Sequence, residues 1–255
     1  MTLVALVTGA SAGLGVDFAH QLARGGKSLV LVARRLDKLE ALAAELRKTK
    51  GIQVFVEASD LSEQGAVKKL MARLAAQDLE VDSLINNAGF GLNGKFSELD
   101  GDRQTDMITL NCTALTELCH AVLPAMIVRK SGQILNVASI AAFQAGPLMA
   151  VYYASKAYVL SFSEALHEEM LPHGIHVSAL CPGATATEFF AAADMGSSLL
   201  NKMAGNPDQV VSDGLRALKN NKAVMVSGLM NKLMVQSTRF APRFITRKLA
   251  KSLQG

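Results

Sequence analysis

The chain has 255 residues, of which 50% are hydrophobic and 19% are charged, and its formal net charge is +4. This composition excludes an intrinsically disordered or collagen-like chain, and the length suffices for one domain with a large core. We find no apolar run of the ~18 residues that cross a bilayer, and no signal-peptide pattern at the start of the sequence.

Short apolar segments alternate with longer amphipathic ones along the chain. Strands are predicted at residues 3–8, 28–33, 53–57, 83–86, 133–138, 176–180 and 223–226. Helices are predicted between them, at residues 13–24, 36–48, 63–76, 103–128, 151–171 and 207–218. Because the strands are apolar on both faces and are separated by helices, this order predicts an α/β fold. We expect a single-domain, doubly wound parallel sheet flanked by helices on both faces.

The first predicted strand runs into a glycine-rich turn, and a helix follows directly. The turn reads Thr8-Gly9-Ala10-Ser11-Ala12-Gly13-Leu14-Gly15. Glycines in this setting allow a tight bend and let the backbone approach a phosphate, while the helix start offers free N–H groups and a positive dipole end. We therefore predict a nucleotide site at Gly9, Ser11, Gly13, Leu14 and Gly15. A glycine-rich turn without a ligand is the alternative.

Further motifs follow the later strands in a recognisable order. They are Asn86-Asn87-Ala88-Gly89 after the fourth strand, Ser139 after the fifth, Tyr152-Tyr153-Ala154-Ser155-Lys156 thirteen residues later, and Cys181-Pro182-Gly183 after the sixth. Together with the G-x-x-x-G-x-G spacing of the turn, these motifs resemble the short-chain dehydrogenase/reductase family over about residues 1–190. Within that family the chain looks most like bacterial carbonyl reductases of broad or unknown substrate. The resemblance implies a Rossmann-type fold, a nicotinamide cofactor and hydride transfer.

The end of the second strand bears on which nicotinamide cofactor binds. By resemblance, NAD-dependent relatives place an acidic side chain there, whereas this chain has Ala33 followed by Arg34 and Arg35. A carboxylate would repel a 2′-phosphate and guanidinium groups can bind one, so we expect NADP(H). The alternative is that both arginines form a solvated helix face. One departure is Ala12, where many NADP(H) relatives carry a basic residue.

Tyr152 and Lys156 are four residues apart on a predicted helix, so their side chains share one face. Reducing a ketone leaves negative charge on oxygen, which must be stabilised and protonated. Tyrosine has a free pKa of about 10, which a nearby cation lowers. We therefore expect Lys156 to lower the pKa of Tyr152 and make it the acid/base. Tyr153 competes on geometry alone, and the family's Y-x-x-x-K pattern selects Tyr152.

The remaining site residues are assigned through the resemblance. Ser139 is expected to hold the substrate oxygen, and Lys156 also the nicotinamide ribose. Asn111 falls where the family keeps an asparagine supporting a water that leads to the lysine; a helix-interior residue satisfied by backbone is the alternative. The expected cofactor-binding set also contains Asp60, Leu61, Asn87, Ala88, Gly89, Tyr152, Pro182, Gly183, Thr185 and Thr187. Asp60 matches the adenine-contacting position, but it could equally cap the helix predicted to begin near Glu63.

The substrate pocket is expected outside the carboxyl ends of the strands. Its candidate lining residues are Phe90, Ile140, Phe143, Met149, Phe189, Phe190 and Met195. The apolar stretch at about 184–206 either folds over the nicotinamide as a lid or only packs against the body of the protein. Its methionines and phenylalanines favour a roomy pocket for an apolar ketone, aldehyde or acyl chain.

The tail, about residues 227–255, is basic and amphipathic. No acidic residue follows Asp213, whereas nine basic residues do. The tail could be a solvated amphipathic helix pair interrupted at Pro242, a subunit contact or a peripheral membrane surface. Its aromatic residues are too sparse to favour nucleic acid, and the five histidines of the chain show no metal-ligand spacing. We therefore expect neither a nucleic-acid partner nor a metal.

Two further expectations concern the setting of the protein. Cys112, Cys119 and Cys181 lack C-x-x-C spacing, which favours buried, reduced thiols in a cytoplasmic protein, a regulatory thiol being the alternative. The family resemblance implies a homodimer or homotetramer through the long helices near 103–128 and 151–171.

Together these observations favour an NADP(H)-dependent alcohol dehydrogenase or carbonyl reductase that acts on an apolar or bulky small molecule. A 3-oxoacyl reductase of acyl chains, whose basic tail receives an acidic carrier or a coenzyme A thioester, is the alternative among enzymes. A non-catalytic NADP(H)-binding sensor or scaffold is the alternative from another class. The complete set of Ser139, Tyr152 and Lys156 argues against it.

Overall fold

A seven-stranded parallel sheet forms the centre of the protein in the computed structural model, which describes residues 1–185 and 205–254. The strands lie in the order β3-β2-β1-β4-β5-β6-β7. Their bounds are β1 (Thr2–Thr8), β2 (Leu29–Ala33), β3 (Val54–Ala58), β4 (Leu79–Asn86), β5 (Gly132–Val137), β6 (Ile175–Cys181) and β7 (Val224–Val226). All the predicted strands are present, so the predicted fold class is confirmed. β4 begins four residues before the predicted strand start, at Leu79.

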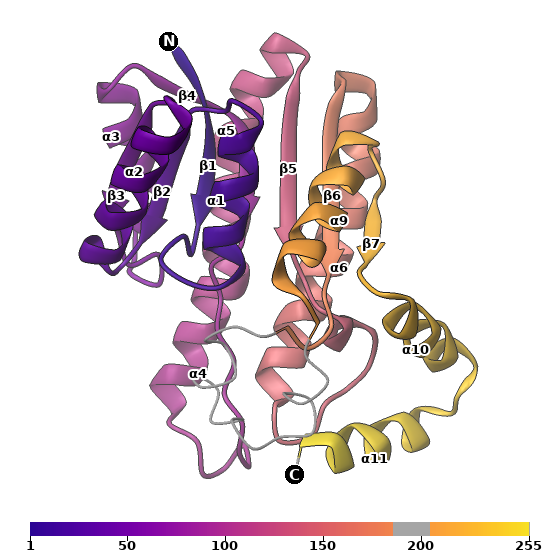
Figure 1. Ribbon diagram of the computed structural model, residues 1–255. Helices are drawn as coiled ribbons and strands as arrows, with labels where there is room; N and C mark the ends of the chain where they lie inside the picture. The colour runs from indigo at the N-terminus through magenta and orange to yellow at the C-terminus, as the bar shows by residue number, and fades with distance from the viewer. Residues whose placement is uncertain (186–204, 255) are drawn as a thin grey trace.

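Helices cover both faces of this sheet (Figure 1). They are α1 (Leu14–Arg24), α2 (Leu36–Lys50), α3 (Ala66–Ala76), α4 (Gly101–Ile108), α5 (Leu115–Arg129), α6 (Ala150–Met170), α9 (Pro207–Lys219), α10 (Leu229–Phe240) and α11 (Arg243–Gln254). Alternate residues of β1 point to opposite faces, as the two-residue repeat of a strand requires. Ala5 and Val7 join a core cluster with α1, α2 and α9, whereas Val4 and Leu6 join a cluster with α3, α5 and α6. Both sheet faces are therefore dry, which explains the uniformly apolar strands.

A single turn of π-helix, Thr109–Ala114, joins α4 to α5. The predicted helix at 103–128 is thus present, but it is not a regular α-helix throughout. Such turns occur mostly at functional sites, because the extra residue re-aims a side chain. Here the irregular turn contains Asn111, one of the candidate site residues.

The continuous helix Gly101–Arg129 also departs from the expectation that no segment could cross a bilayer. It has 29 residues and a mean hydropathy of 1.3 in its most apolar window, so by length and composition it could span a membrane. Its inner face packs on the sheet through Leu118, Cys119 and Val122, all buried. Within that window 39% is buried, so packing on the sheet accounts for the apolar character of the inner face only.

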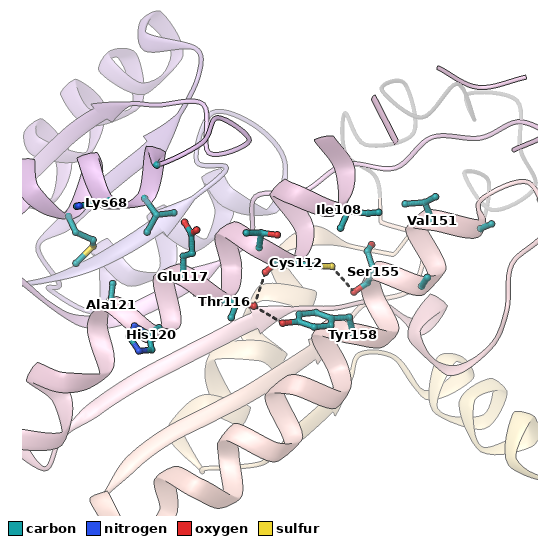
Figure 2. Close-up of a pocket in the computed structure, with 16 residues that line it drawn as sticks. Lys68, Ile108, Cys112, Thr116, Glu117, His120, Ala121, Val151, Ser155 and Tyr158 are labelled. Carbon is teal, nitrogen blue, oxygen red and sulfur yellow. Dashed lines mark hydrogen bonds between the residues drawn. The ribbon is translucent and has the colours of Figure 1, made fainter. Parts of the chain in front are cut away.

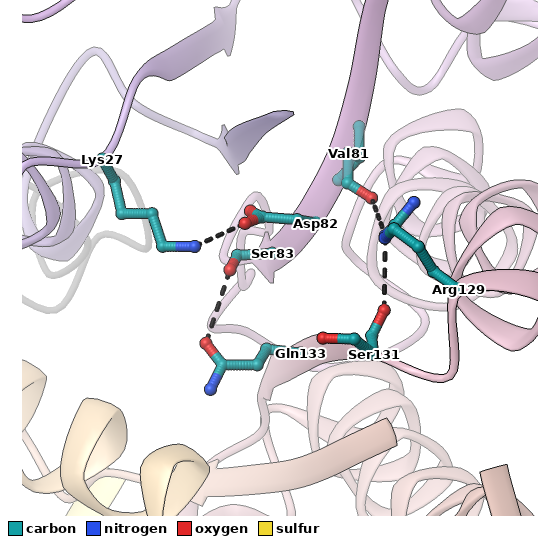
Figure 3. Close-up of polar contacts among 7 residues, drawn as sticks. All are labelled: Lys27, Val81, Asp82, Ser83, Arg129, Ser131 and Gln133. Atoms are coloured by element: carbon teal, nitrogen blue, oxygen red, sulfur yellow. Dashed lines mark hydrogen bonds and ion pairs between the residues drawn. The ribbon is translucent and has the colours of Figure 1, made fainter. Parts of the chain in front are cut away.

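Polar contacts join the amino ends of the strands (Figure 3). The Lys27 ammonium lies 2.5 Å from Asp82, and the Ser83 hydroxyl donates to the Gln133 side chain at 3.4 Å. The Arg129 guanidinium donates to the backbone oxygen of Val81 at 3.3 Å. These contacts join the strands near their amino ends. The candidate site residues follow the opposite, carboxyl ends of the strands.

The tail forms two helices, α10 and α11, separated at Pro242 as predicted. They lie beyond the carboxyl ends of the strands, and α10 packs against the 3₁₀ helix Ile140–Phe143 (Figure 1). Val235 of α10 and Ala250 of α11 are buried and anchor the two helices.

Candidate active site

The glycine-rich turn connects β1 to α1 and is built from bare backbone. Gly9 has a φ of +67°, which favours glycine because a Cβ crowds the backbone in this region. A Cβ on Gly15 would lie 2.1 Å from the Gly9 oxygen, so no other residue fits there without moving the turn. No side chain caps the start of α1, whose N-cap is Gly13. The first N–H groups of α1 are thus available to an anionic group, which fits a dinucleotide pyrophosphate.

Thr8 and Asn87 hold this turn against the loop after β4. The Thr8 hydroxyl accepts hydrogen bonds from the backbone N–H groups of Asn87 at 3.0 Å and Ala88 at 2.9 Å. The Asn87 amide donates to the Thr8 backbone oxygen at 2.9 Å. Sequence reasoning did not assign a role to Thr8. Its signal was a buried hydroxyl at the end of an otherwise apolar strand.

Asn86, next in the chain, braces the sheet from within, as the sequence indicated. Its amide donates to the side-chain oxygen of Asn136 at 2.9 Å, and the Asn136 amide in turn donates to Ser163 at 2.9 Å. The chain of contacts links β4, β5 and α6 below the site.

Both arginines that follow β2 lie close to the turn. The Arg35 guanidinium donates to the backbone oxygen of Ser11 at 3.1 Å and to its hydroxyl at 3.3 Å. The Arg34 guanidinium lies 3.6 Å from the Asp60 carboxylate and is largely exposed. Arg35 thus contacts the turn itself, and Arg34 lies beside Asp60.

The alternative role of Asp60 as a helix cap is wrong. The α3 helix begins at Ala66 after a Gly65 N-cap, and not near Glu63. The Asp60 carboxylate instead accepts hydrogen bonds from the Ser62 N–H and hydroxyl. Partial burial would raise the pKa of Asp60, but the Ser62 hydrogen bonds and the charge of Arg34 together lower it. Asp60 is therefore a charged turn residue that also holds Arg34. Leu61 beside it is buried in the core.

Tyr152 of α6 is buried and faces Ser139, which follows β5. Burial raises the pKa of Tyr152 to about 12, a hydrogen bond with Ser139 lowers it, and Tyr153 raises it. The Ser139 hydroxyl also accepts from the N–H of Ala141 at 3.1 Å, because Ser139 caps the short 3₁₀ helix Ile140–Phe143. The hydroxyl and the phenol thus converge where a substrate oxygen can be held.

Lys156 lies one helical turn from Tyr152 and is also buried. Its ammonium donates to the Val137 backbone oxygen at 2.8 Å and lies 5.9 Å from the centre of the Tyr152 ring. Burial lowers the pKa of Lys156 to about 8, and the nearby thiols of Cys112 and Cys181 raise it. The predicted lowering of the Tyr152 pKa by Lys156 is therefore wrong for the protein alone. The Lys156 ammonium is held by the Val137 oxygen, and burial of the Tyr152 phenol has the largest effect on the pKa of Tyr152.

Asn111 in the π turn connects the loop after β4 to α6. Its amide donates to the Phe90 oxygen and to the Ser155 hydroxyl, each at 3.0 Å, while its oxygen accepts from the Phe90 N–H at 3.1 Å. The Ser155 hydroxyl donates to the Tyr152 backbone oxygen at 2.7 Å. Most hydrogen bonds of the Asn111 side chain are thus with backbone, as the alternative interpretation held. The backbone is that of Phe90, in the loop after β4, and not that of its own helix. A Cβ on Gly89 would lie 2.8 Å from Asn111 and 3.6 Å from the Lys156 ammonium, so these groups are close neighbours.

A small apolar cluster surrounds Tyr152. Its buried members are Met107, Ala141, Met149 and Tyr152, with Phe90 packed against them. The Arg103 guanidinium lies over the Phe90 ring, 5.6 Å from its centre. The cluster brings together two of the predicted pocket residues, Phe90 and Met149.

Other predicted pocket residues are placed differently. Phe143 packs against the main core, because a 3₁₀ helix turns about 120° per residue and aims Ala141, and not Phe143, at Tyr152. Ile140 donates its N–H to the Pro182 oxygen at 2.9 Å and so ties the loop after β5 to the loop after β6. Thr187, Phe189, Phe190 and Met195 lie outside the described residues, as does most of the expected lid.

The loop after β6 is covered by the start of α10. A Cβ on Gly183 would lie 2.4 Å from the Asn231 side chain, so α10 packs directly on this loop. Thr185 is buried and its hydroxyl donates to the Gly183 oxygen at 3.1 Å. Sequence reasoning did not connect Asn231 to the site, because the contact joins segments far apart in the chain.

The cysteines of the chain are free, and Cys119 and Cys181 are buried, whereas Cys112 is only half-buried. Burial raises the pKa of both Cys119 and Cys181 to about 12, so these thiols are poor nucleophiles. Within residues 1–185 and 205–254, no group of three His, Cys, Asp or Glu side chains is arranged to hold a metal ion.

A large cavity lies on the outer side of the helices and not at the carboxyl ends of the strands (Figure 2). It is a mainly apolar groove of about 1240 Å³ lined by α3, the π turn, α5 and α6. Tyr158 and Thr116 form a hydrogen bond of 2.8 Å across its floor. Because Cys112 and Ser155 also line it, the groove backs directly onto the Tyr152 site.

Residues 3–196 match the short chain dehydrogenase family. The very-long-chain 3-oxoacyl-CoA reductase of Phaeosphaeria nodorum is 39% identical over 183 residues, covering 68% of this chain and 52% of that protein. The chain thus spans about half the length of that curated relative.

Solved structures share the fold over nearly the whole chain. A short-chain dehydrogenase from Sphingobium yanoikuyae in complex with NADPH has a TM-score of 0.84 and 34% identity, covering 96% of this chain and 95% of its own. A short chain dehydrogenase/reductase from Burkholderia phymatum in complex with NAD has a TM-score of 0.81 and 25% identity, covering 92% of each chain.

Proposed function

This chain belongs to the short-chain dehydrogenase/reductase family, and we propose that it interconverts a carbonyl group and an alcohol with NADP(H). Membership makes it an oxidoreductase with a nicotinamide cofactor; the choice of NADP(H) and of the substrate is the proposal. The observation that carries it is the convergence of Ser139, Tyr152 and Lys156 beside a turn of bare backbone. The three side chains follow the carboxyl end of β5, and the turn follows the carboxyl end of β1, with β4 between these two strands.

The proposed chemistry assigns each side chain a separate task. A bound nicotinamide supplies hydride to the carbonyl carbon. Ser139 holds the carbonyl oxygen by a hydrogen bond, and Tyr152 donates its phenolic proton to that oxygen as negative charge develops. Burial raises the pKa of Tyr152 to about 12, so the phenol carries its proton at neutral pH and gives it up only to a stronger base, such as the oxygen on which negative charge develops. The Lys156 ammonium, one turn away, stabilises the phenolate that remains.

The side chains near the turn support NADP(H) over NAD(H). Ala33 ends β2 where an acidic residue would repel a 2′-phosphate, and Arg34 and Arg35 follow it. Arg35 already reaches the turn through Ser11, and Arg34 is exposed beside Asp60. The family neighbours include complexes with NADPH and with NAD, so the arginines are the basis of this choice.

Replacing Arg34 or Arg35 with alanine should weaken NADPH binding selectively. Each change removes a charge-assisted contact worth ~1.5–3 kcal/mol, so we expect a roughly 10- to 100-fold rise in the Kd of NADPH and little change for NADH. Fluorescence titration of each cofactor measures this. The exposed Lys38→Ala on α2 is the matched control, and an equal loss for both cofactors would contradict a 2′-phosphate contact.

The apolar cluster around Tyr152 supports an apolar substrate. Met107, Met149 and Phe90 present no charge to the space beside the phenol. A second candidate within the same chemistry is a 3-oxoacyl thioester, favoured by the name of the relative from Phaeosphaeria nodorum. Comparing a 3-oxoacyl-coenzyme A with a simple ketone of the same chain length separates the two.

We also propose a cytoplasmic location, because the cysteines are free thiols.

The decisive test of the reaction is Tyr152→Phe, with Tyr153→Phe as its neighbour control. Loss of the general acid should lower turnover at least ~100-fold, while NADPH affinity remains nearly unchanged. A screen of ketones, aldehydes and alcohols, followed by nicotinamide absorbance, measures turnover, and fluorescence titration measures affinity. Near-normal rates in Tyr152→Phe would disprove the acid/base assignment. Tight NADPH binding by the unmodified protein without turnover of any carbonyl would instead support a sensor.

A further inference from the structure

Helices α10 and α11 expose large apolar side chains that cover nothing in the described structure. In α10 they include Leu229, Leu233 and Phe240, with Leu229 75% and Phe240 88% exposed. Their spacing of four and seven residues puts them on one helix face. In α11 they are Phe244, Ile245 and Leu249, of which Ile245 and Leu249 are four residues apart. We call these six side chains the tail surface.

Every charge on these helices is positive. The cations are Lys232, Arg239, Arg243, Arg247, Lys248 and Lys251, and all six are exposed. No acidic residue occurs after Asp213. None of the six forms an ion pair with an acidic side chain within residues 1–185 and 205–254. The tail surface is therefore an apolar face edged by one sign of charge.

We propose that the tail surface docks on a lipid bilayer that contains anionic lipids. An interfacial helix buries its apolar face at the boundary between headgroups and acyl chains, and its flanking Lys and Arg side chains contact anionic headgroups. A flat anionic surface complements both features at once. A second copy of the tail does not, because a two-fold contact would bring the six cations of each copy together with no acidic group between them.

Docking would also orient the candidate active site toward the membrane. Both helices lie beyond the carboxyl ends of the strands, where the site residues are found (Figure 1). Asn231 at the start of α10 packs on Gly183, and Val235 buries α10 against the body of the protein. The surface is thus rigidly connected to the loop after β6. The docking itself does not depend on which reaction the site performs.

The proposal is tested by sedimenting the 255-residue chain with vesicles. The probes are pure phosphatidylcholine vesicles and vesicles that also contain phosphatidylglycerol, each at low and high salt. We expect binding to the anionic vesicles only, weakened by salt because screening reduces the attraction between cations and headgroups.

Two tail variants separate the charge from the apolar face. Arg243→Glu combined with Arg247→Glu and Lys248→Glu should reduce binding at least roughly tenfold, since each cation adds to the attraction. Phe240→Ser combined with Phe244→Ser should do the same without changing charge. The charge control is Lys38→Glu with Lys48→Glu and Lys50→Glu on exposed positions of α2, and the apolar control is Phe96→Ser, at a site 66% exposed elsewhere.

Circular dichroism and light scattering accompany each variant, so that unfolding or a changed molar mass is recognised. Loss in the tail variants with unchanged folding and binding in the controls supports the proposal. It is overturned if the unmodified protein ignores anionic vesicles, or if the tail and control variants lose binding equally. A drop in molar mass in the tail variants, with vesicle binding unchanged, would show that a second copy covers the surface instead.

Discussion

Lys156 places an ammonium group in the interior of the protein, between the Val137 oxygen and the Tyr152 ring. Burial lowers its pKa from 10.5 to about 8. The group is therefore charged at neutral pH but close to losing its proton, which suits a residue that must respond to charge on a neighbouring phenol. The same burial makes it costly to the folded state.

This cost predicts a pH dependence of stability. Between pH 8 and 10.5 the unfolded chain holds a proton on Lys156 that the folded chain has released. The contribution of Lys156 to the free energy of unfolding therefore rises with pH through that window and is lost as pH falls toward 8. We expect the unmodified protein to gain stability relative to Lys156→Met over this range, measured by urea unfolding.

Subtracting the free energy of unfolding of Lys156→Met from that of the unmodified protein removes the contribution of Tyr152, which both proteins contain and which changes with pH in the opposite direction. Burial raises the pKa of Tyr152 to about 12, so that residue alone lowers stability as pH rises above its unfolded value of 10. Parallel stability curves for the two proteins from pH 8 to 10.5 would mean that Lys156 titrates normally and is not buried as described.

At the scale of an element, α1 packs closely against the turn that precedes it only because Gly15 has no side chain. Gly15 lies in the first turn of α1, where a Cβ would meet the Gly9 oxygen at 2.1 Å. The contact is with backbone, which cannot rotate away as a flexible side chain could. The close approach of helix to turn is what leaves the backbone N–H groups accessible at its surface.

We therefore expect Gly15→Ala to damage the turn and Gly101→Ala to be harmless. Forcing a Cβ into the turn should destabilise the protein by about 1–3 kcal/mol and raise the Kd of NADPH. Gly101 begins α4 with nothing within 4 Å of the added Cβ, so the same substitution there should be neutral or slightly stabilising. Thermal unfolding and cofactor titration compare the two. Equal behaviour of both variants would contradict the close approach at Gly15.

Elements were also where prediction from sequence failed most clearly. Periodicity predicted one helix at 103–128, but the π turn at Thr109–Ala114 interrupts it and aims Asn111 at Phe90 and Ser155. Periodicity is read over a window of roughly 11–18 residues, which is too wide to locate one extra residue in a single turn. The start of α3 was likewise predicted too early. The Ser62 N–H is bound by the Asp60 carboxylate in a separate turn, and the helix begins only at Ala66.

At the scale of the whole molecule, the groove along α3, α5 and α6 is a cavity of about 1240 Å³. We propose that a second copy of the chain covers it, as the family resemblance implied for the long helices. The groove is mainly apolar, and its floor carries the exposed Tyr158 ring stacked on Phe162. An apolar cavity of about 1240 Å³ left open to water is typical of a surface that another chain buries.

Ala154→Arg tests this contact. Ala154 is exposed on α6 and lines the groove, so an arginine there would place two charges in a self-complementary apolar contact. We expect the molar mass measured by light scattering to fall to that of a monomer. The matched control is Ala41→Arg on the exposed face of α2, which should leave the mass unchanged. A monomeric unmodified protein would overturn the proposal without affecting the reaction.

The sequence by itself determined the order of strands and helices and the glycine turn, because periodicity and spacing along a single segment are local properties of a chain. The candidate set of Ser139, Tyr152 and Lys156 came from the resemblance of its motifs to the family. The tertiary structure decided what depends on distant segments. These are the hydrogen bond from Lys156 to the Val137 oxygen, the packing of Phe143 against the main core and the contact of Asn231 with Gly183. Burial, and the pKa values it shifts, depend on every element that surrounds a group, and no single segment contains that information.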